Sequence, residues 1–189
     1  MKPSPSLPAL LVCLALLPGC APRATTFVNE NVDFGRIRRC AVLPMRNLSQ
    51  DQGAAERVQS VFLTELLKAG KGLQIVEPGE TNAALRELRL NTAEPIQPAR
   101  LVELGRRLGA DGIFGGAVLE YGIEQGSRDR VTLVTAEFDL SETETGSLIW
   151  KTEIQGKGTS LWRKLFGGEP ASLYAVTRDV ARQALETLF

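Results

Sequence analysis

Residues 113–155 read IFGGAVLEYGIEQGSRDRVTLVTAEFDLSETETGSLIWKTEIQ, and this stretch decides the fold. Two short polar turns separate three runs that resemble strands. The runs are 113–123, 131–140 and 148–155, and the turns are 126–129 and 142–146. The first run opens apolar on both faces, as a central strand does, and the other two alternate, with Leu148 and Trp150 on the inward face of the last. Turns this short join antiparallel neighbours, so the stretch predicts a three-stranded meander.

The rest of the chain shows helical spacing between short apolar runs. Strands are predicted over 39–43 and 73–76, and helices over 51–70, from Pro78, from Pro98 to 108 and from about 171. The resulting order is β-α-β-α-α-β-β-β-α, whose front half suits parallel pairing through crossover helices. We therefore predict an α/β fold in which residues 37–189 form a single domain with a mixed β-sheet flanked by helices.

The N-terminus carries a secretion signal. Lys2 precedes an eleven-residue apolar run, Leu7 to Leu17, which is much shorter than the roughly 20 residues that span a bilayer. The run ends at Leu17-Pro18-Gly19-Cys20, which resembles the bacterial lipobox, with Pro18 as its unusual letter. We predict a signal peptide over residues 1–19, cleavage before Cys20 and lipidation of Cys20. Cleavage of an ordinary secretory signal elsewhere nearby is the alternative.

Residues 20–36 lack clear periodicity and predict a flexible tether, which could extend to roughly 50 Å. Ala21 follows the cysteine where Asp would mark inner-membrane retention. By resemblance to enterobacterial sorting, this favours a lipid anchor in the outer membrane and a domain on its periplasmic face.

Composition excludes several functional classes. Loss of Lys2 with the signal leaves 21 basic and 22 acidic residues, and this balance gives no basic surface for nucleic acid. The sequence has no histidine, the commonest general base and a common zinc ligand. Cys40 is the only cysteine left after processing and lipidation, and it lies in a strand-like run. We expect no enzyme activity, no cofactor, no metal site and no disulfide within the chain.

The serines and carboxylates show no catalytic pattern. Ser49, Ser60, Ser127 and Ser160 have no histidine to activate them, although a serine–lysine pair stays open. Asp51, Glu56, Glu65 and Glu77 are typical of helix ends and solvated faces. Gly115-Gly116, with Gly112, lies inside a strand and predicts close packing or a bulge, where a phosphate loop would need a strand-to-helix turn.

Four segments together resemble the CsgG-like family of bacterial outer-membrane lipoproteins, which includes LpoB-like and TolB N-terminal-like domains. The segments are CAVLPMRNLS (40–49), TELLKAG with LQIVE (64–70 and 73–77), LGRRLGADGI with GGAVLEY (104–113 and 115–121), and TG with LIW (145–146 and 148–150). The resemblance implies an α/β module of the anticodon-binding or TolB-N type without enzyme activity, used to bind periplasmic or envelope proteins. The short hairpin turns depart from the channel-forming members, whose long hairpins build a membrane barrel.

We therefore expect a binding or assembly adaptor for an envelope complex in secretion or envelope biogenesis, acting singly or as a homo-oligomer. Two alternatives stay open: an activator of a peptidoglycan synthase and a subunit of a curli-type secretion channel.

A loop before the last helix, residues 160–168, is the candidate contact surface. It combines Trp162, Leu165 and Phe166 with Arg163 and Lys164, a mixture that is enriched at protein interfaces. The alternative is that its aromatic residues cap the core under the last helix.

Overall fold

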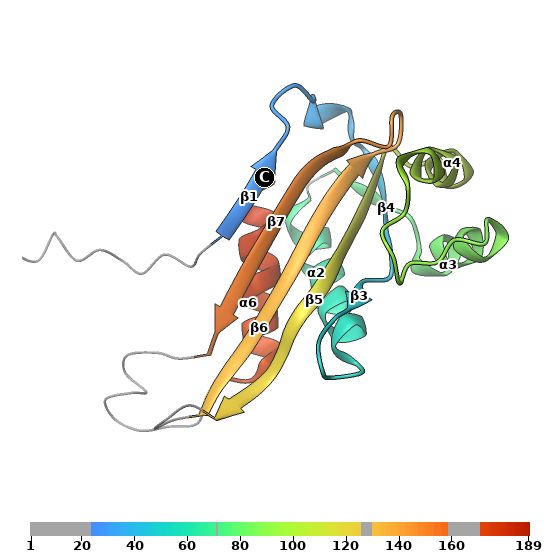
Figure 1. Cartoon of the computed structure of the whole chain (residues 1–189). Coiled ribbons are helices and arrows are strands. Elements are labelled where there is room, and N and C mark those ends of the chain that lie inside the picture. The colour runs from blue at the N-terminus through green and yellow to red at the C-terminus, as the bar shows by residue number, and fades with distance from the viewer. Residues whose placement is uncertain (1–23, 71, 126–129, 159–170) are drawn as a thin grey trace, which may run out of the picture.

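The computed structural model describes residues 24–70, 72–125, 130–158 and 171–189, whose strands form one mixed sheet (Figure 1). The strands are β1 (Ala24–Val28), β2 (Arg39–Val42), β3 (Arg46–Asn47), β4 (Gln74–Ile75), β5 (Gly112–Gln125), β6 (Arg130–Glu142) and β7 (Leu148–Lys157). The helices are the short 3₁₀ turn η2 (Phe34–Arg36), α2 (Ala54–Ala69), α3 (Pro78–Glu87), α4 (Pro98–Leu108) and α6 (Leu173–Glu186). The sheet order is β1-β7-β6-β5-β2-β4, with β3 beside β5.

The predicted α/β fold with a mixed sheet is confirmed. Strands β5, β6 and β7 form the antiparallel meander, and β2 lies parallel to both β4 and β5. Helices α3 and α4 begin at Pro78 and Pro98, where a missing N–H costs nothing because the first turn has no partner for it. Helix α4 ends at Gly109, whose φ of 58° lies in the left-handed region that glycine tolerates.

The sheet separates two hydrophobic cores. The larger core lies under α2 and α6 and contains Phe62, Phe114, Phe138 and Trp150, each at most 1% exposed. The smaller core lies under α3 and α4 on the opposite face. Strand β2 and the residue after it contribute side chains to both cores. Cys40 and Val42 face the larger core, whereas Ala41 and Leu43 face the smaller one. This two-sided burial explains the continuous apolar run in the sequence.

The prediction of a flexible tether over residues 20–36 is wrong for residues 24–36. Ala24–Val28 pairs antiparallel with β7 as an edge strand, and Thr26 shares a 2.8 Å hydrogen bond with Thr152. Phe34–Arg36 forms η2, where the Asp33 carboxylate accepts the N–H of Gly35. All five side chains of β1 are exposed, so the strand leaves no alternating pattern in the sequence.

The prediction that Leu148 faces the core is also wrong. The register between β6 and β7 shifts between Leu140 and Ser141, as at a β-bulge. Leu148 is consequently 40% exposed, and Ile149 is buried beside Trp150 instead.

Candidate functional site

The predicted site residues lie outside the described residues. This holds for Cys20, the lipidation site, and for Trp162, Arg163, Leu165 and Phe166 of the contact loop. Both assignments stay predictions. The structure fixes their flanks, because β1 begins four residues after Cys20, and the loop connects β7 to α6.

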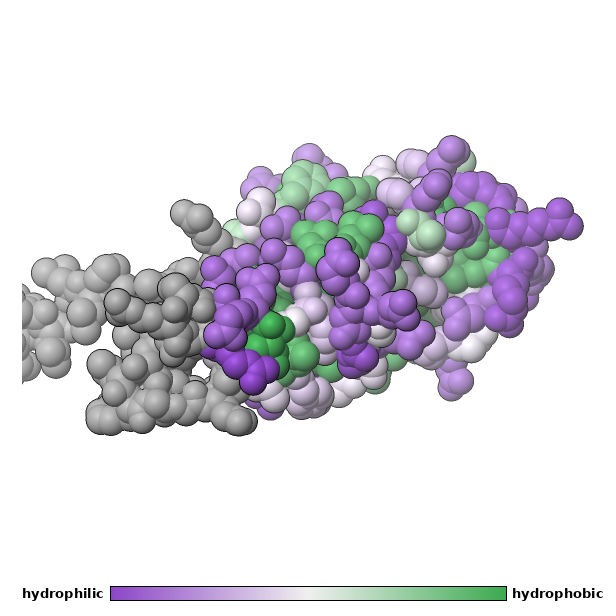
Figure 2. All heavy atoms as spheres, turned by 60° about the horizontal axis from the view of Figure 1, so that its bottom comes forward, coloured by the Kyte–Doolittle hydropathy of each residue, from purple (hydrophilic) through white to green (hydrophobic). Residues whose placement is uncertain are grey.

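One face of the sheet is largely uncovered by the helices that the structure describes. Helices α2 and α6 lie behind the long strands in Figure 1, whereas α3 and α4 cover the other face only near β2, β4 and the start of β5. The remaining part of that face, over β5, β6, β7 and β1, is here called the open face. Figure 2 shows hydrophobic patches separated by hydrophilic side chains on the surface that it presents.

Polar side chains cross the open face in rows of cross-strand neighbours. One row contains Glu120, Thr135 and Gln155, in which the Glu120 carboxylate accepts hydrogen bonds from Thr135 Oγ1 and from Gln155 Nε2 at 3.4 Å. A second row contains Ala117, Glu137, Glu153 and Thr25, and a third contains Gly115, Asp139, Lys151 and Phe27. Apart from Phe27, Ala117 and the glycine, these side chains are polar or charged.

Glu137 forms ion pairs with two cationic side chains, Lys151 and Arg46. Its Oε2 lies 3.1 Å from Lys151 Nζ and 3.9 Å from Arg46 Nη2. Arg46 comes from β3, which reaches this position because it pairs with β5 at Ala117 and Val118. The Glu137 side chain is only 20% exposed, so these ion pairs are less screened by solvent than pairs on the outer surface.

A hollow of about 260 Å³ adjoins this cluster. It lies between the open face and the α3–α4 connection, and it has both apolar and polar lining residues. The lining includes Leu43, Pro44, Pro95, Ile96 and Leu148 on the apolar side, and Arg46, Glu94, Asp139, Ser141 and Lys151 on the polar side. The hollow therefore brings together segments that are far apart in the sequence.

Asp139 is the unusual group in this hollow. Burial raises the pKa of its carboxyl, and the negative charge of Glu137 adds to the rise, although Lys151 and Arg46 oppose it. Its neighbour across the strands is Gly115, where an added Cβ would lie 2.8 Å from Asp139 Oδ1. Glycine at this position therefore leaves room for the carboxylate against β5.

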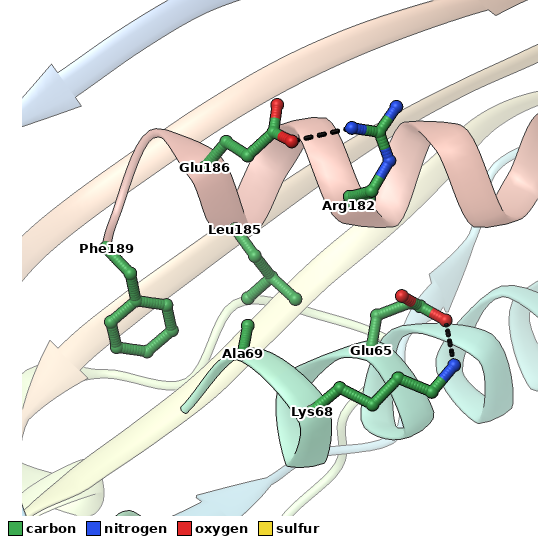
Figure 3. Close-up of a pocket in the computed structure, with 7 residues that line it drawn as sticks. All are labelled: Glu65, Lys68, Ala69, Arg182, Leu185, Glu186 and Phe189. Carbon is green, nitrogen blue, oxygen red and sulfur yellow. Dashed lines mark hydrogen bonds and ion pairs between the residues drawn. The ribbon is translucent and has the colours of Figure 1, made fainter. Parts of the chain in front are cut away.

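A second hollow, of about 350 Å³, lies between the C-terminal ends of α2 and α6 (Figure 3). Its charged residues are paired within each helix, Lys68 with Glu65 at 2.7 Å and Arg182 with Glu186 at 2.6 Å. Leu185 and Phe189 supply apolar surface between the pairs. The charged side chains of this hollow are already paired with one another, whereas the first hollow contains Asp139, which has no ion-pair partner among the described residues.

The described residues include a buried thiol and no cluster of possible metal ligands. Cys40 is fully buried, and burial raises the pKa of its thiol to about 12, so the thiolate nucleophile is suppressed at neutral pH. In the ranges that the structure covers, no three His, Cys, Asp or Glu side chains lie close enough to hold a metal ion. None of the helices placed by the structure is long and apolar enough to cross a bilayer.

The motif residues behind the family resemblance have structural contacts. Asp111 Oδ2 accepts the backbone N–H groups of Arg38 at 3.0 Å and Arg39 at 2.9 Å, which fixes the start of β2 against the start of β5. Asn47 Nδ2 donates to the carbonyl of Asp51 at 2.8 Å and thereby shapes the loop before α2. Trp150 Nε1 donates to Thr187 Oγ1 at 3.0 Å. The motif residues named here therefore have roles in stabilising the fold.

The Asp139 hollow leaves only a weak signal in the sequence. The alternation of the runs 131–140 and 148–155 puts Glu137, Asp139 and Lys151 on the polar strand faces, and this alternation is the available signal. The nearness of Arg46 and of Ile96 depends on the parallel β3–β5 pairing and on the path of the α3–α4 connection. Neither follows from local periodicity.

Searches with the sequence found no matching family model and no matching curated protein. Comparison of the structure found similar folds. The PelC dodecamer from Paraburkholderia phytofirmans has a TM-score of 0.62 and 18% identity over 89% of this chain and 97% of that chain. Lipoprotein GNA1162 from Neisseria meningitidis has a TM-score of 0.53 and 20% identity over 64% of this chain and 82% of that chain.

A third similar structure is the hypothetical protein CT253 from Chlamydia trachomatis, with a TM-score of 0.52 and 11% identity over 80% of this chain and 95% of that chain. At these identities a likeness shows the fold and leaves the function to the site. The resemblance to CsgG-like and TolB domains stays a prediction. The chain thus shares its fold with PelC, GNA1162 and CT253.

Proposed function

We propose that this chain is a non-enzymatic lipoprotein that binds another protein of an envelope complex, in secretion or in envelope biogenesis. Its anchor is a lipid on Cys20 in the outer membrane, and its domain faces the periplasm. The observation that carries the proposal is the position of β1, which begins four residues after Cys20 and forms the edge of the open face. Four residues extend to at most about 14 Å, so the lipid would hold this face close to the membrane.

The similar structures support two parts of the proposal. GNA1162 is described as a lipoprotein, which agrees with a lipid on Cys20. PelC is described as a dodecamer, which agrees with a homo-oligomer as the working form. The absence of histidine from the sequence and the buried state of Cys40 support a binding role without catalysis.

Labelling cells with radioactive palmitate tests the anchor. Wild type should incorporate label and remain with the outer membrane on fractionation, whereas Cys20→Ser should be unlabelled. Cys40→Ser is the matched control, because Cys40 is buried in the domain, and it should be labelled like the wild type. An unlabelled wild-type protein would refute the lipoprotein assignment.

Cross-linking followed by affinity purification from intact cells tests the binding role. A partner from one envelope complex should be recovered with the wild type and lost when the open face carries charge reversals such as Glu153→Lys. Recovery of a penicillin-binding protein would select the activator alternative. Recovery of ring particles with membrane-embedded strands would select the channel alternative and contradict the adaptor.

A further inference from the structure

We infer that the Asp139 hollow binds the cationic side chain of a lysine or arginine from a partner protein, with the Asp139 carboxylate as its counter-charge. This inference deepens the proposed binding function and rests on it for the partner being a protein. Three features of the hollow carry the inference: an unpaired carboxylate, apolar walls and a limited volume.

The unpaired carboxylate is the first feature. Lys151 is the direct cross-strand neighbour of Asp139, yet its Nζ lies on Glu137 at 3.1 Å. Arg46 is directed to the same Glu137. Within the described ranges Asp139 takes part in no ion pair or side-chain hydrogen bond, although it is half-buried. A buried ionised carboxylate without a partner is costly, and a cationic donor removes that cost.

The apolar walls are the second feature. Leu43, Ile96 and Leu148 line the hollow together with Pro44 and Pro95. Lysine and arginine have methylene stems that pack along apolar surface while the charged head remains at a polar group. Such a stem would lie against these walls and bring its head to Asp139.

The volume of the hollow and the charges around it favour a single cationic side chain over an anionic ligand. At about 260 Å³ the hollow has room for one long side chain. Ser141, which is 7% exposed, lines the hollow and offers a second acceptor, and Glu94 adds negative charge at its edge. An anionic ligand would have to draw Lys151 and Arg46 away from Glu137, so the hollow favours a cation.

The test uses small probes on the Cys20→Ser chain. n-Butylguanidinium, n-butylurea and pentanoate share a four-carbon stem and differ in charge. Amide resonances of Gly115, Gly116 and Ser141 should shift saturably with n-butylguanidinium at millimolar concentrations. Asp139→Asn should weaken this binding at least tenfold. Glu56→Gln is the matched control, because this exposed carboxylate lies on α2, across the sheet from the hollow, and it should bind like the parent chain.

Equal binding to Asp139→Asn, or saturable binding of pentanoate or n-butylurea at the same amides, would overturn the inference. Gly115→Ala supplies a second variant, because its Cβ would crowd Asp139 Oδ1 while the charge is retained. It should also weaken binding by severalfold. These measurements need neither the lipid nor the partner, so their failure is separate from failure of the palmitate and cross-linking experiments.

Discussion

Replacement of Phe62 by alanine tests whether the three-ring cluster holds α2 on the sheet. Phe62 is 1% exposed, and its ring stacks on Phe138 with centroids 4.6 Å apart and meets Phe114 edge-on at 5.7 Å. Truncation of a buried phenylalanine costs about 3–5 kcal/mol, of which each aromatic pair contributes about 0.5–1.5 kcal/mol. We expect Phe62→Ala to lower the free energy of unfolding by about 4 kcal/mol.

The assay is urea unfolding of the Cys20→Ser chain followed by circular dichroism, with midpoints compared at an unchanged slope. Leu67→Ala is the control on the same helix, because Leu67 is 62% exposed, and it should change stability by less than about 0.5 kcal/mol. A double-mutant cycle of Phe62→Leu with Phe138→Leu should give a coupling of about 1 kcal/mol. A loss below about 1 kcal/mol in Phe62→Ala, or no coupling, would refute the role assigned to the cluster.

Three further variants test contacts elsewhere in the domain. Asp111→Ala should cost about 2 kcal/mol in urea unfolding, because its carboxylate accepts two backbone N–H groups at the start of β2, and a cost equal to that of exposed positions would contradict this. Gly116→Ala should lower the melting temperature, since its Cβ would clash with the Glu137 carbonyl oxygen, whereas Gly122→Ala, which meets nothing within 4 Å, should not. Cys40 should resist thiol reagents at pH 8 until the chain unfolds. Its pKa is about 12 in the fold against 9.0 as the ordinary value, so the unfolded thiol ionises first. Stability relative to Cys40→Ala should therefore fall as pH rises from 9 toward 12, by about 1.4 kcal/mol per pH unit, and a pH-independent difference would contradict the burial.

Most of the sheet could be predicted from the sequence because burial of one strand face makes apolar and polar residues alternate along the strand. Strands β6 and β7 alternate, and β5 opens apolar on both faces, since the two cores require those patterns. Strand β1 has β-branched and aromatic residues in Ala24–Val28, but it buries none of them. Its partner β7 is more than a hundred residues away in the sequence. Local periodicity therefore had no means of indicating the strand.

The candidate site was less predictable for a similar reason. Alternation placed Asp139 on a polar strand face, which the structure confirms. Its enclosure comes from Ile96 and Pro95 in the α3–α4 connection, a segment with no period of its own. The bulge that exposes Leu148 to the hollow depends on pairing between β6 and β7. The enclosure and the bulge both depend on contacts between segments that are distant in the sequence, so local sequence patterns do not predict them.

Strand β1 also has a mechanical consequence. A lipid on Cys20 would pass tension from the membrane into β1, and from there through its ladder into β7, which β6 holds against the larger core. A free coil over the seventeen residues 20–36 would first uncoil and absorb the pull. With β1 in place there is little slack, so movement of the membrane would reach the open face almost undiminished. The domain would then act as a stiff coupling between the envelope and its partner.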